Sequence, residues 1–328
     1  MDYINYVKQS PMMGQIGLGG GATSLGRYAS TPAEWSGGDR GMFMGGDTDP
    51  GFSSQIDYRN VTTTGNFSGF GNLTNSRKNP ASGSNGTRAV CGGGYTPGSL
   101  EDIIDYVTIA STGNATTFGD LTQARDRLAC ASNNSRAVFY GGASPANSTT
   151  IDFVNVDTTG NATSFGSLSP ARKAMAGGIS NGERGVFGGG HPDTANMYHI
   201  TINTEGNAYS VFGYLSKSTW GIAGASNDTR GLFFGGTPTS PWGGTDDIEY
   251  ITIDTEADAQ TFGTQDPIGY YQEACANSTR ALVAGVENDT TVSNKIDYVT
   301  IATTGNSVDF GTLAAARKSA GGTSGDDS

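Results

Sequence analysis

A pattern of polar and apolar positions recurs six times along the chain, about 48 residues apart. Each unit has an arginine, a short apolar run and two glycines, then an I-D-Y-V-T-I-like run, a T-x-G-N turn and an F-G-x-L ending. The leading arginines are 48, 48, 48, 46 and 50 residues apart, at Arg40, Arg88, Arg136, Arg184, Arg230 and Arg280. A period of about 40–50 residues in a β-rich chain is the length of one propeller blade. The pattern predicts six blades stacked into a ring, because one blade cannot bury both of its faces.

The unit at residues 125–168 shows the strands that each blade is expected to form. From the axis outward, the four expected strands cover residues 126–132, 136–140, 151–156 and 162–165. Gly141-Gly142 ends the second strand where neighbouring backbone must come close. Gly160-Asn161 suits a tight hairpin turn, since both residue types tolerate positive φ. The third strand is apolar on both faces, as a strand packed between two other blades requires.

The two ends of the chain complement each other. Residues 316–325 match the innermost strand of the other units but stop before a second strand, and residues 40–46 supply a second strand without an innermost one. Pairing them would complete a composite blade and remove the open sheet edges. The expected fold is therefore all-β, a six-bladed propeller over residues 31–328 that is closed by its terminal strands. Residues 1–30 would form an extended N-terminal arm.

Composition agrees with this fold and excludes several function classes. Glycine accounts for 51 of 328 residues and charged residues for 15%, which suits short strands joined by tight turns. The net charge of −12, with no run rich in lysine or arginine, argues against nucleic-acid binding. No apolar run is long enough for a membrane helix, and we expect neither membrane insertion nor a signal peptide. The three cysteines, Cys91, Cys130 and Cys275, are expected to be reduced and buried.

The repeat resembles kelch-type repeats over residues 36–328. Gly-Gly follows the second strand in five units and is Ala284-Gly285 in the last; Phe165 stands for the usual kelch tryptophan, and the turn 168–172 resembles the kelch arginine turn. The stretch IDYVTIATTGNSVDFGTLAAARKSAGG looks like repeats of virion proteins of tailed bacteriophages, particularly those of marine cyanobacteria. The opening VKQSPMMGQIGLGGGATSLGRY looks like the start of such proteins. The resemblance implies a structural component of the virion.

Residues that repeat in every unit are expected to serve the scaffold. Arg136 could pair with a repeated carboxylate such as Asp105 or Asp152 and satisfy turn carbonyls. The same is expected of a second arginine set, Arg77, Arg125, Arg172 and Arg317. Departures from the repeat are better candidates for contact with a ligand. The aromatic residues at such departures are Trp220, Trp242, Tyr270 and Tyr271.

Chemistry other than binding has little support in the sequence. The two histidines, His191 and His199, lack metal-site spacing, and the acidic pairs lack a full calcium ligand set. We therefore expect no enzymatic activity, no metal and no cofactor. The arm cannot form its own core, and it is expected to dock on other virion proteins. Its candidate contact residues are Tyr3, Tyr6, Met12, Met13, Ile16 and Leu18.

Two functions remain open at this point. The first is a structural virion protein, displayed on the tail, baseplate, fibre or head and attached through the arm. The second is a module that binds a host-surface glycan or protein receptor through its loop aromatics. Both place the protein in the virion.

Overall fold

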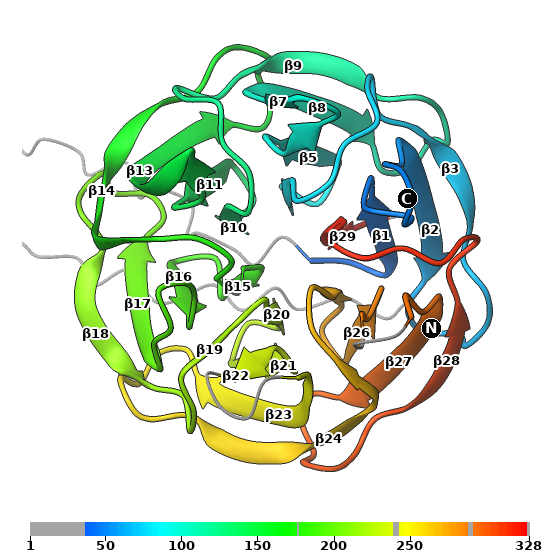
Figure 1. Ribbon diagram of the computed structural model, residues 1–328, viewed down its shortest axis with the longest axis vertical. Coiled ribbons are helices and arrows are strands. Elements are labelled where there is room, and N and C mark those ends of the chain that lie inside the picture. Colours follow the sequence, from blue (N-terminus) through cyan, green and yellow to red (C-terminus); the bar gives the residue numbers. More distant parts are fainter. Residues whose placement is uncertain (1–36, 176, 239–242, 288–290, 327–328) are drawn as a thin grey trace, which may run out of the picture. The chain divides into compact units, whose positions relative to one another are not determined.

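The protein folds as a six-bladed β-propeller in which six antiparallel sheets surround a central axis (Figure 1). The computed structural model describes residues 37–175, 177–238, 243–287 and 291–326. All regular structure in these ranges is β-strand, so no helix there could span a membrane. The all-β, six-bladed fold predicted from the repeat is confirmed. The predicted arm, residues 1–30, lies outside the described residues with all six of its candidate contacts.

Each blade has four main strands that follow one another outward from the axis. Blade 1 consists of β29 (Gly321–Gly325), β1 (Arg40–Met44), β2 (Gln55–Asn60) and β3 (Ser68–Asn72). Blade 2 consists of β4 (Ala81–Ser84), β5 (Arg88–Gly92), β8 (Ile103–Thr108) and β9 (Thr116–Asp120). Blade 3 consists of β10 (Ala129–Ser132), β11 (Arg136–Tyr140), β13 (Ala146–Asn155) and β14 (Thr163–Arg172).

The second half of the ring repeats this arrangement. Blade 4 consists of β15 (Ile179–Ser180), β16 (Arg184–Gly188), β17 (Asn196–Thr201) and β18 (Tyr209–Tyr214). Blade 5 consists of β20 (Ala223–Ser226), β21 (Arg230–Phe234), β23 (Thr245–Thr252) and β24 (Gln260–Gly269). Blade 6 consists of β25 (Glu273–Ala276), β26 (Arg280–Ala284), β27 (Lys295–Thr300) and β28 (Val308–Thr312). Short strands in the connections are β6 (Tyr95–Thr96), β7 (Ser99–Leu100), β12 (Ala143–Ser144), β19 (Thr219–Trp220) and β22 (Thr237–Pro238).

The strands predicted for the unit at 125–168 are the strands of blade 3, with two longer than expected. The second strand matches residue for residue, and the innermost strand is the last part of the predicted stretch. The third and outer strands extend into the adjoining loops because Ser148 pairs with Arg172 beyond a shift in register. The repeat therefore marks the centre of each strand better than its ends.

The ring closes through the two ends of the chain, as predicted. The last strand, β29, pairs antiparallel with β1 over five residue pairs, from Arg40 opposite Gly325 to Met44 opposite Gly321. Figure 1 shows the resulting blade, with the red C-terminal strand beside the blue first strand. Blade 1 is thus the composite one, and β29 also lies against the innermost strands of blades 2 and 6.

The hydrophobic core is divided among the interfaces between blades. Six clusters of buried side chains are present in the described chain, and each joins two neighbouring blades. Between blades 2 and 3, for example, Val90 and Phe118 pack with Phe139 and Val154. The third strands are accordingly buried on both faces, which explains their apolar pattern. Since each cluster is shared, a blade gains its core only from its neighbours.

Five asparagines and one aspartate, at the last position of the T-x-G-N-like turns, join the outer edges of neighbouring blades. Each side-chain oxygen accepts a hydrogen bond from a backbone N–H of the preceding blade, at 2.9–3.2 Å. The acceptors are Asn66, Asn114, Asn161, Asn207, Asp258 and Asn306. The bond from Thr312 to Asn66 closes this outer set between blades 6 and 1. The repeated turn therefore supplies a contact between blades as well as a hairpin.

Candidate functional site

The six arginines that begin the repeat connect each blade to the next one. Each guanidinium lies over an aromatic ring of its own blade, 4.3–5.7 Å from the ring centre. Each also donates to a carbonyl oxygen at the end of the next blade's third strand, as Arg40 does to Ile109 at 2.7 Å. Arg280 completes the circle by donating to Thr62 of blade 1. These arginines serve the scaffold, as expected.

The predicted carboxylate partners of Arg136 are wrong. Arg136 lies opposite Asn155, whereas Asp152 lies opposite Phe139, three residues along the same strand. Since side chains alternate along a strand, a separation of three residues places Asp152 on the opposite face of the sheet from Asn155. Asp152 is also roughly 10 Å from Asn155 along the strand. Arg136 instead covers Phe153 and pairs with Glu205 at 2.9 Å.

Asp105 and Asp152 belong to the second arginine set. Three members of this set form ion pairs in which both side chains are fully buried: Arg77–Asp105, Arg125–Asp152 and Arg317–Asp57. Each of these arginines also donates to the carbonyl oxygen of a second strand, at 3.0–3.4 Å. The fourth member, Arg172, has no such partner among the described residues, because Tyr198 of blade 4 occupies the equivalent acidic position; Arg172 donates to the carbonyl oxygen of Pro192.

One face of the propeller carries a closed circle of backbone hydrogen bonds around the axis, which we call the axial ring. Its six members precede the innermost strands, and all have left-handed φ values of 53–66°. They are Asn79, Arg127, Ala174, Gly221, Tyr271 and Ser319. The N–H of each donates to the carbonyl oxygen of the preceding member at 2.7–3.1 Å, and Asn79 donates to Ser319. The backbone geometry is the same in every blade, while the side chains all differ.

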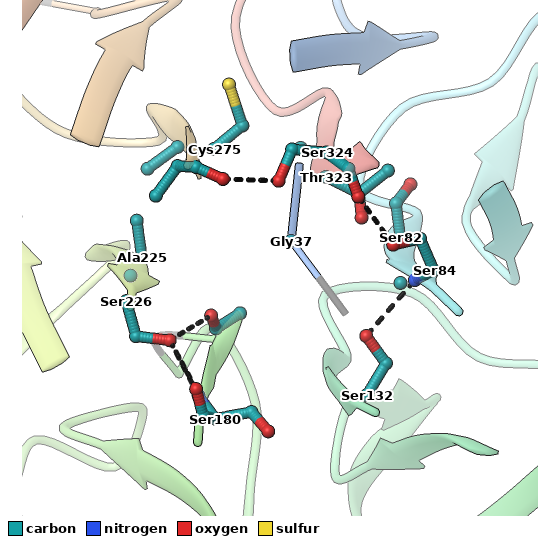
Figure 2. A pocket seen from close by; sticks show the side chains of 16 residues that line it. Gly37, Ser82, Ser84, Ser132, Ser180, Ala225, Ser226, Cys275, Thr323 and Ser324 are labelled. Carbon is teal, nitrogen blue, oxygen red and sulfur yellow. Dashed lines mark hydrogen bonds between the residues drawn. The ribbon is translucent and has the colours of Figure 1, made fainter. Parts of the chain in front are cut away.

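Small side chains line the central channel beyond the axial ring. One equivalent position near the end of each innermost strand is occupied by Ser84, Ser132, Ser180, Ser226, Ala276 and Ser324. Figure 2 shows the five serines around the channel, with Gly37 between them. Ser84 donates to the carbonyl oxygen of Ser324 at 2.5 Å, and Ser226 donates to that of Ser180 at 2.8 Å. Ser324 in turn donates to the carbonyl oxygen of Ala276, so serine hydroxyls join blade 1 to blades 2 and 6, and blade 5 to blade 4. Ala276 itself has no hydroxyl to donate.

Three of the four predicted aromatic candidates lie together. Trp220 and Tyr271 pack edge to face with ring centres 5.4 Å apart, and Tyr271 packs in the same way against Tyr270 at 5.3 Å. His191, which the sequence did not single out as a contact residue, adds its ring 6.0 Å from Trp220. These four residues form what we call the aromatic cluster. Trp242 lies outside the described residues.

The repeat explains why these side chains meet. Trp220 and Tyr270 each come directly after the position that the second arginine set (Arg77, Arg125, Arg172 and Arg317) occupies in the other units. Tyr271 is a member of the axial ring, next to Gly221 in that ring. His191 enters from the loop after a double glycine, where its backbone pairs with Lys173. Burial raises the pKa of the Tyr271 hydroxyl, while Arg127 nearby lowers it. Trp220, Tyr270 and Tyr271 are all half-buried.

The remaining candidate groups are dispersed. His191 is 47% exposed and lies 3.5 Å from Asp193, whereas His199 is buried in β17. Burial lowers the pKa of His199, and the positive charge of Arg184 lowers it further. Cys91, Cys130 and Cys275 are buried and form no disulfide, as predicted. Within the described ranges, no three histidine, cysteine, aspartate or glutamate side chains are grouped to hold a metal ion.

Comparison with known proteins gives no matching family model and no matching curated protein. Function is therefore inferred from the repeat, the geometry of the ring and the residues that depart from the repeat.

Proposed function

We propose that this chain is a structural protein of a tailed-phage particle, displayed on the tail, baseplate, fibre or head. The proposal rests on the resemblance of the repeat IDYVTIATTGNSVDFGTLAAARKSAGG, and of the opening residues, to those of phage virion proteins. Residues 1–30 attach the propeller to other virion proteins. The ring supports this role because arginine and asparagine contacts, together with buried cores, join all six pairs of neighbouring blades.

The attachment is tested on particles. Deleting residues 1–30 should leave the propeller folded, with an unchanged melting temperature (Tm), but absent from purified virions by mass spectrometry. A variant with residues 1–30 in scrambled order is the matched control, and it should also be lost from virions if the arm binds through specific side chains. Incorporation of the deletion variant at the normal level would contradict the proposal.

A second function, recognition of a glycan or protein on the host surface, is favoured by the aromatic cluster. Aromatic faces on loops of a rigid scaffold stack on sugar rings or on a partner's side chains. The cluster gathers four rings on one face of a chain whose repeated residues are otherwise engaged in the scaffold. This function is compatible with the first, because a displayed propeller can also bind.

Binding is tested with two variants of the cluster. Trp220→Ala and Tyr271→Ala should each lower binding to host cells or glycans about ten-fold or more, since buried aromatic contacts dominate binding energy. Tyr214→Ala is the matched control, because Tyr214 is a 50% exposed aromatic on β18 outside the cluster. Equal effects of all three variants would exclude the cluster as the binding site, and they would leave the structural role intact.

A further inference from the structure

One acidic side chain departs from the repeat inside the central channel. Glu273 begins the innermost strand of blade 6, where it lies opposite Ala284 of β26. The equivalent residues of the other blades carry at most a methyl group: Gly321, Ala81, Ala129, Gly177 and Ala223. Glu273 is thus the one charged member of a set that otherwise consists of glycine and alanine.

Glu273 lines two consecutive sections of the channel. All six members of the axial ring line the outer section, and the inner section follows it towards the serines. Each section has about 50 Å³ open to the centre of a water molecule, whereas one water needs about 10–15 Å³. Gly37 lies between the serines at the far end (Figure 2), so the mouth at the axial ring leads more directly to Glu273.

The carboxyl group of Glu273 lacks a counterion. Among the described residues that line the two sections, it is the only carboxyl group. Burial raises its pKa well above the ordinary value, and no hydrogen bond or neighbouring charge within the described ranges offsets this effect. An unpaired acid at such a place costs stability. Since five blades do without it, the cost indicates a functional residue rather than a structural one.

Other polar side chains at the mouth are already engaged. Arg127 is the other charged residue among the described lining, and its guanidinium pairs with Asp126 at 3.4 Å. The amide of Asn79 also donates to Asp126, at 3.0 Å. The amide of Gln272 donates to a carbonyl oxygen of blade 5 at 2.6 Å. Glu273 therefore supplies the unbalanced charge of the lining.

We propose that the channel binds a primary ammonium group on a linear aliphatic stem, with the ammonium at Glu273. Glu273 lies two residues beyond Tyr271 of the axial ring, which is about 7 Å along a strand. A lysine side chain reaches about 6 Å from its Cα to its nitrogen, so its length matches this depth. The stem packs against Pro80, Leu128 and Ile222 of the outer section. The carboxylate accepts from the ammonium, and the remaining N–H groups donate to waters, for which the two sections have room.

The site is tested by titrating the full chain with n-butylammonium, which reproduces the end of a lysine side chain, and following binding by NMR. Tetramethylammonium has the charge without N–H groups or a stem, and 1-butanol has the stem without the charge, so neither should bind. Glu273→Gln and Glu273→Ala should each weaken binding of butylammonium about ten-fold or more, because the charge partner is lost. Glu183→Gln removes the same charge at an exposed position and should bind like the wild type. Unchanged binding in the two Glu273 variants, or equal binding of butylammonium and tetramethylammonium, overturns the proposal.

Thermal unfolding and a second pair of probes complete the test. Glu273→Ala gives blade 6 the residue that three other blades carry, so it should fold, and its Tm should rise because an unpaired acid is removed. A lower Tm would show that Glu273 serves the fold and would overturn the proposal. Cadaverine and a short peptide with one lysine separate the two sources of such a group. Tighter binding of the peptide identifies a lysine of a partner protein, tighter binding of cadaverine identifies a free diamine, and binding of neither contradicts the site.

Discussion

The buried Arg125–Asp152 pair allows a sharp test of how the blades are held together. Both side chains are fully buried. Asp152 accepts hydrogen bonds from both terminal nitrogens of Arg125, and from the N–H and hydroxyl of Thr122 at 2.9 and 2.6 Å. Asp152→Ala leaves the guanidinium buried with only the carbonyl oxygens of Gln123 and Phe139, at 3.3 and 3.4 Å. An unpaired buried charge of this kind costs about 3–5 kcal/mol.

That cost is a large share of the 5–15 kcal/mol by which folded proteins are usually stable, so Tm should fall by about 10 °C. The assay is equilibrium denaturation by urea, followed by tryptophan fluorescence. Glu205→Ala is the matched control, because it removes the exposed partner of Arg136 and should cost less than about 1 kcal/mol. The double variant Arg125→Met/Asp152→Leu should recover most of the loss, since apolar residues can replace a buried pair. Equal losses from Asp152→Ala and Glu205→Ala would refute the reasoning.

Three further perturbations test the ring. Deleting residues 321–328 removes the five residue pairs between β29 and β1 and should cost about 5 kcal/mol in urea denaturation, far more than deleting residues 1–8; equal Tm values would contradict closure by β29. Ala276→Ser should stabilise the protein by about 1 kcal/mol, because a serine at this position can donate to the neighbouring blade as its equivalent Ser226 does to Ser180; a loss of stability would show that the position has no room. Burial raises the pKa of Cys275 from 9.0 to about 12, so stability should decline above pH 9, where only the unfolded chain ionises. Cys275→Ala should reduce that decline, and an unchanged slope between pH 9 and 11 would argue against a buried thiol.

Much of the fold could be predicted because the same pattern of residues occurs six times. Six units of about 48 residues predicted six blades, and the incomplete units at the two ends predicted the pairing of β29 with β1. The arginine partners could not be predicted in the same way. Asp105 and Asp152 are near Arg136 in the pattern, but side chains three residues apart point to opposite faces of a strand.

The candidate site was predicted only in part, for a similar reason. Trp220, Tyr270 and Tyr271 stood out because they depart from the repeat, and the structure brings them together. His191 joins them through a loop whose course the pattern does not determine. The serines of the channel recur with the same period as the arginines, so the sequence alone could have revealed them. The axial ring left no signal in residue type, since its members share a backbone conformation and nothing else.

The shared backbone conformation of the axial ring affects which amino-acid substitutions the protein can accept. In the axial ring, the hydrogen bonds that close the circle join backbone atoms, so they do not depend on which side chain each member carries. A substitution at these positions must tolerate a left-handed φ, which glycine and asparagine meet most easily, and at Asn79, Ala174 and Ser319 it must also fit a buried space. Arg127 and Tyr271, whose side chains are partly exposed, are thus the positions that can vary on a fixed frame. Selection in nature or in the laboratory could vary them in combination and obtain new surfaces from one unchanged ring.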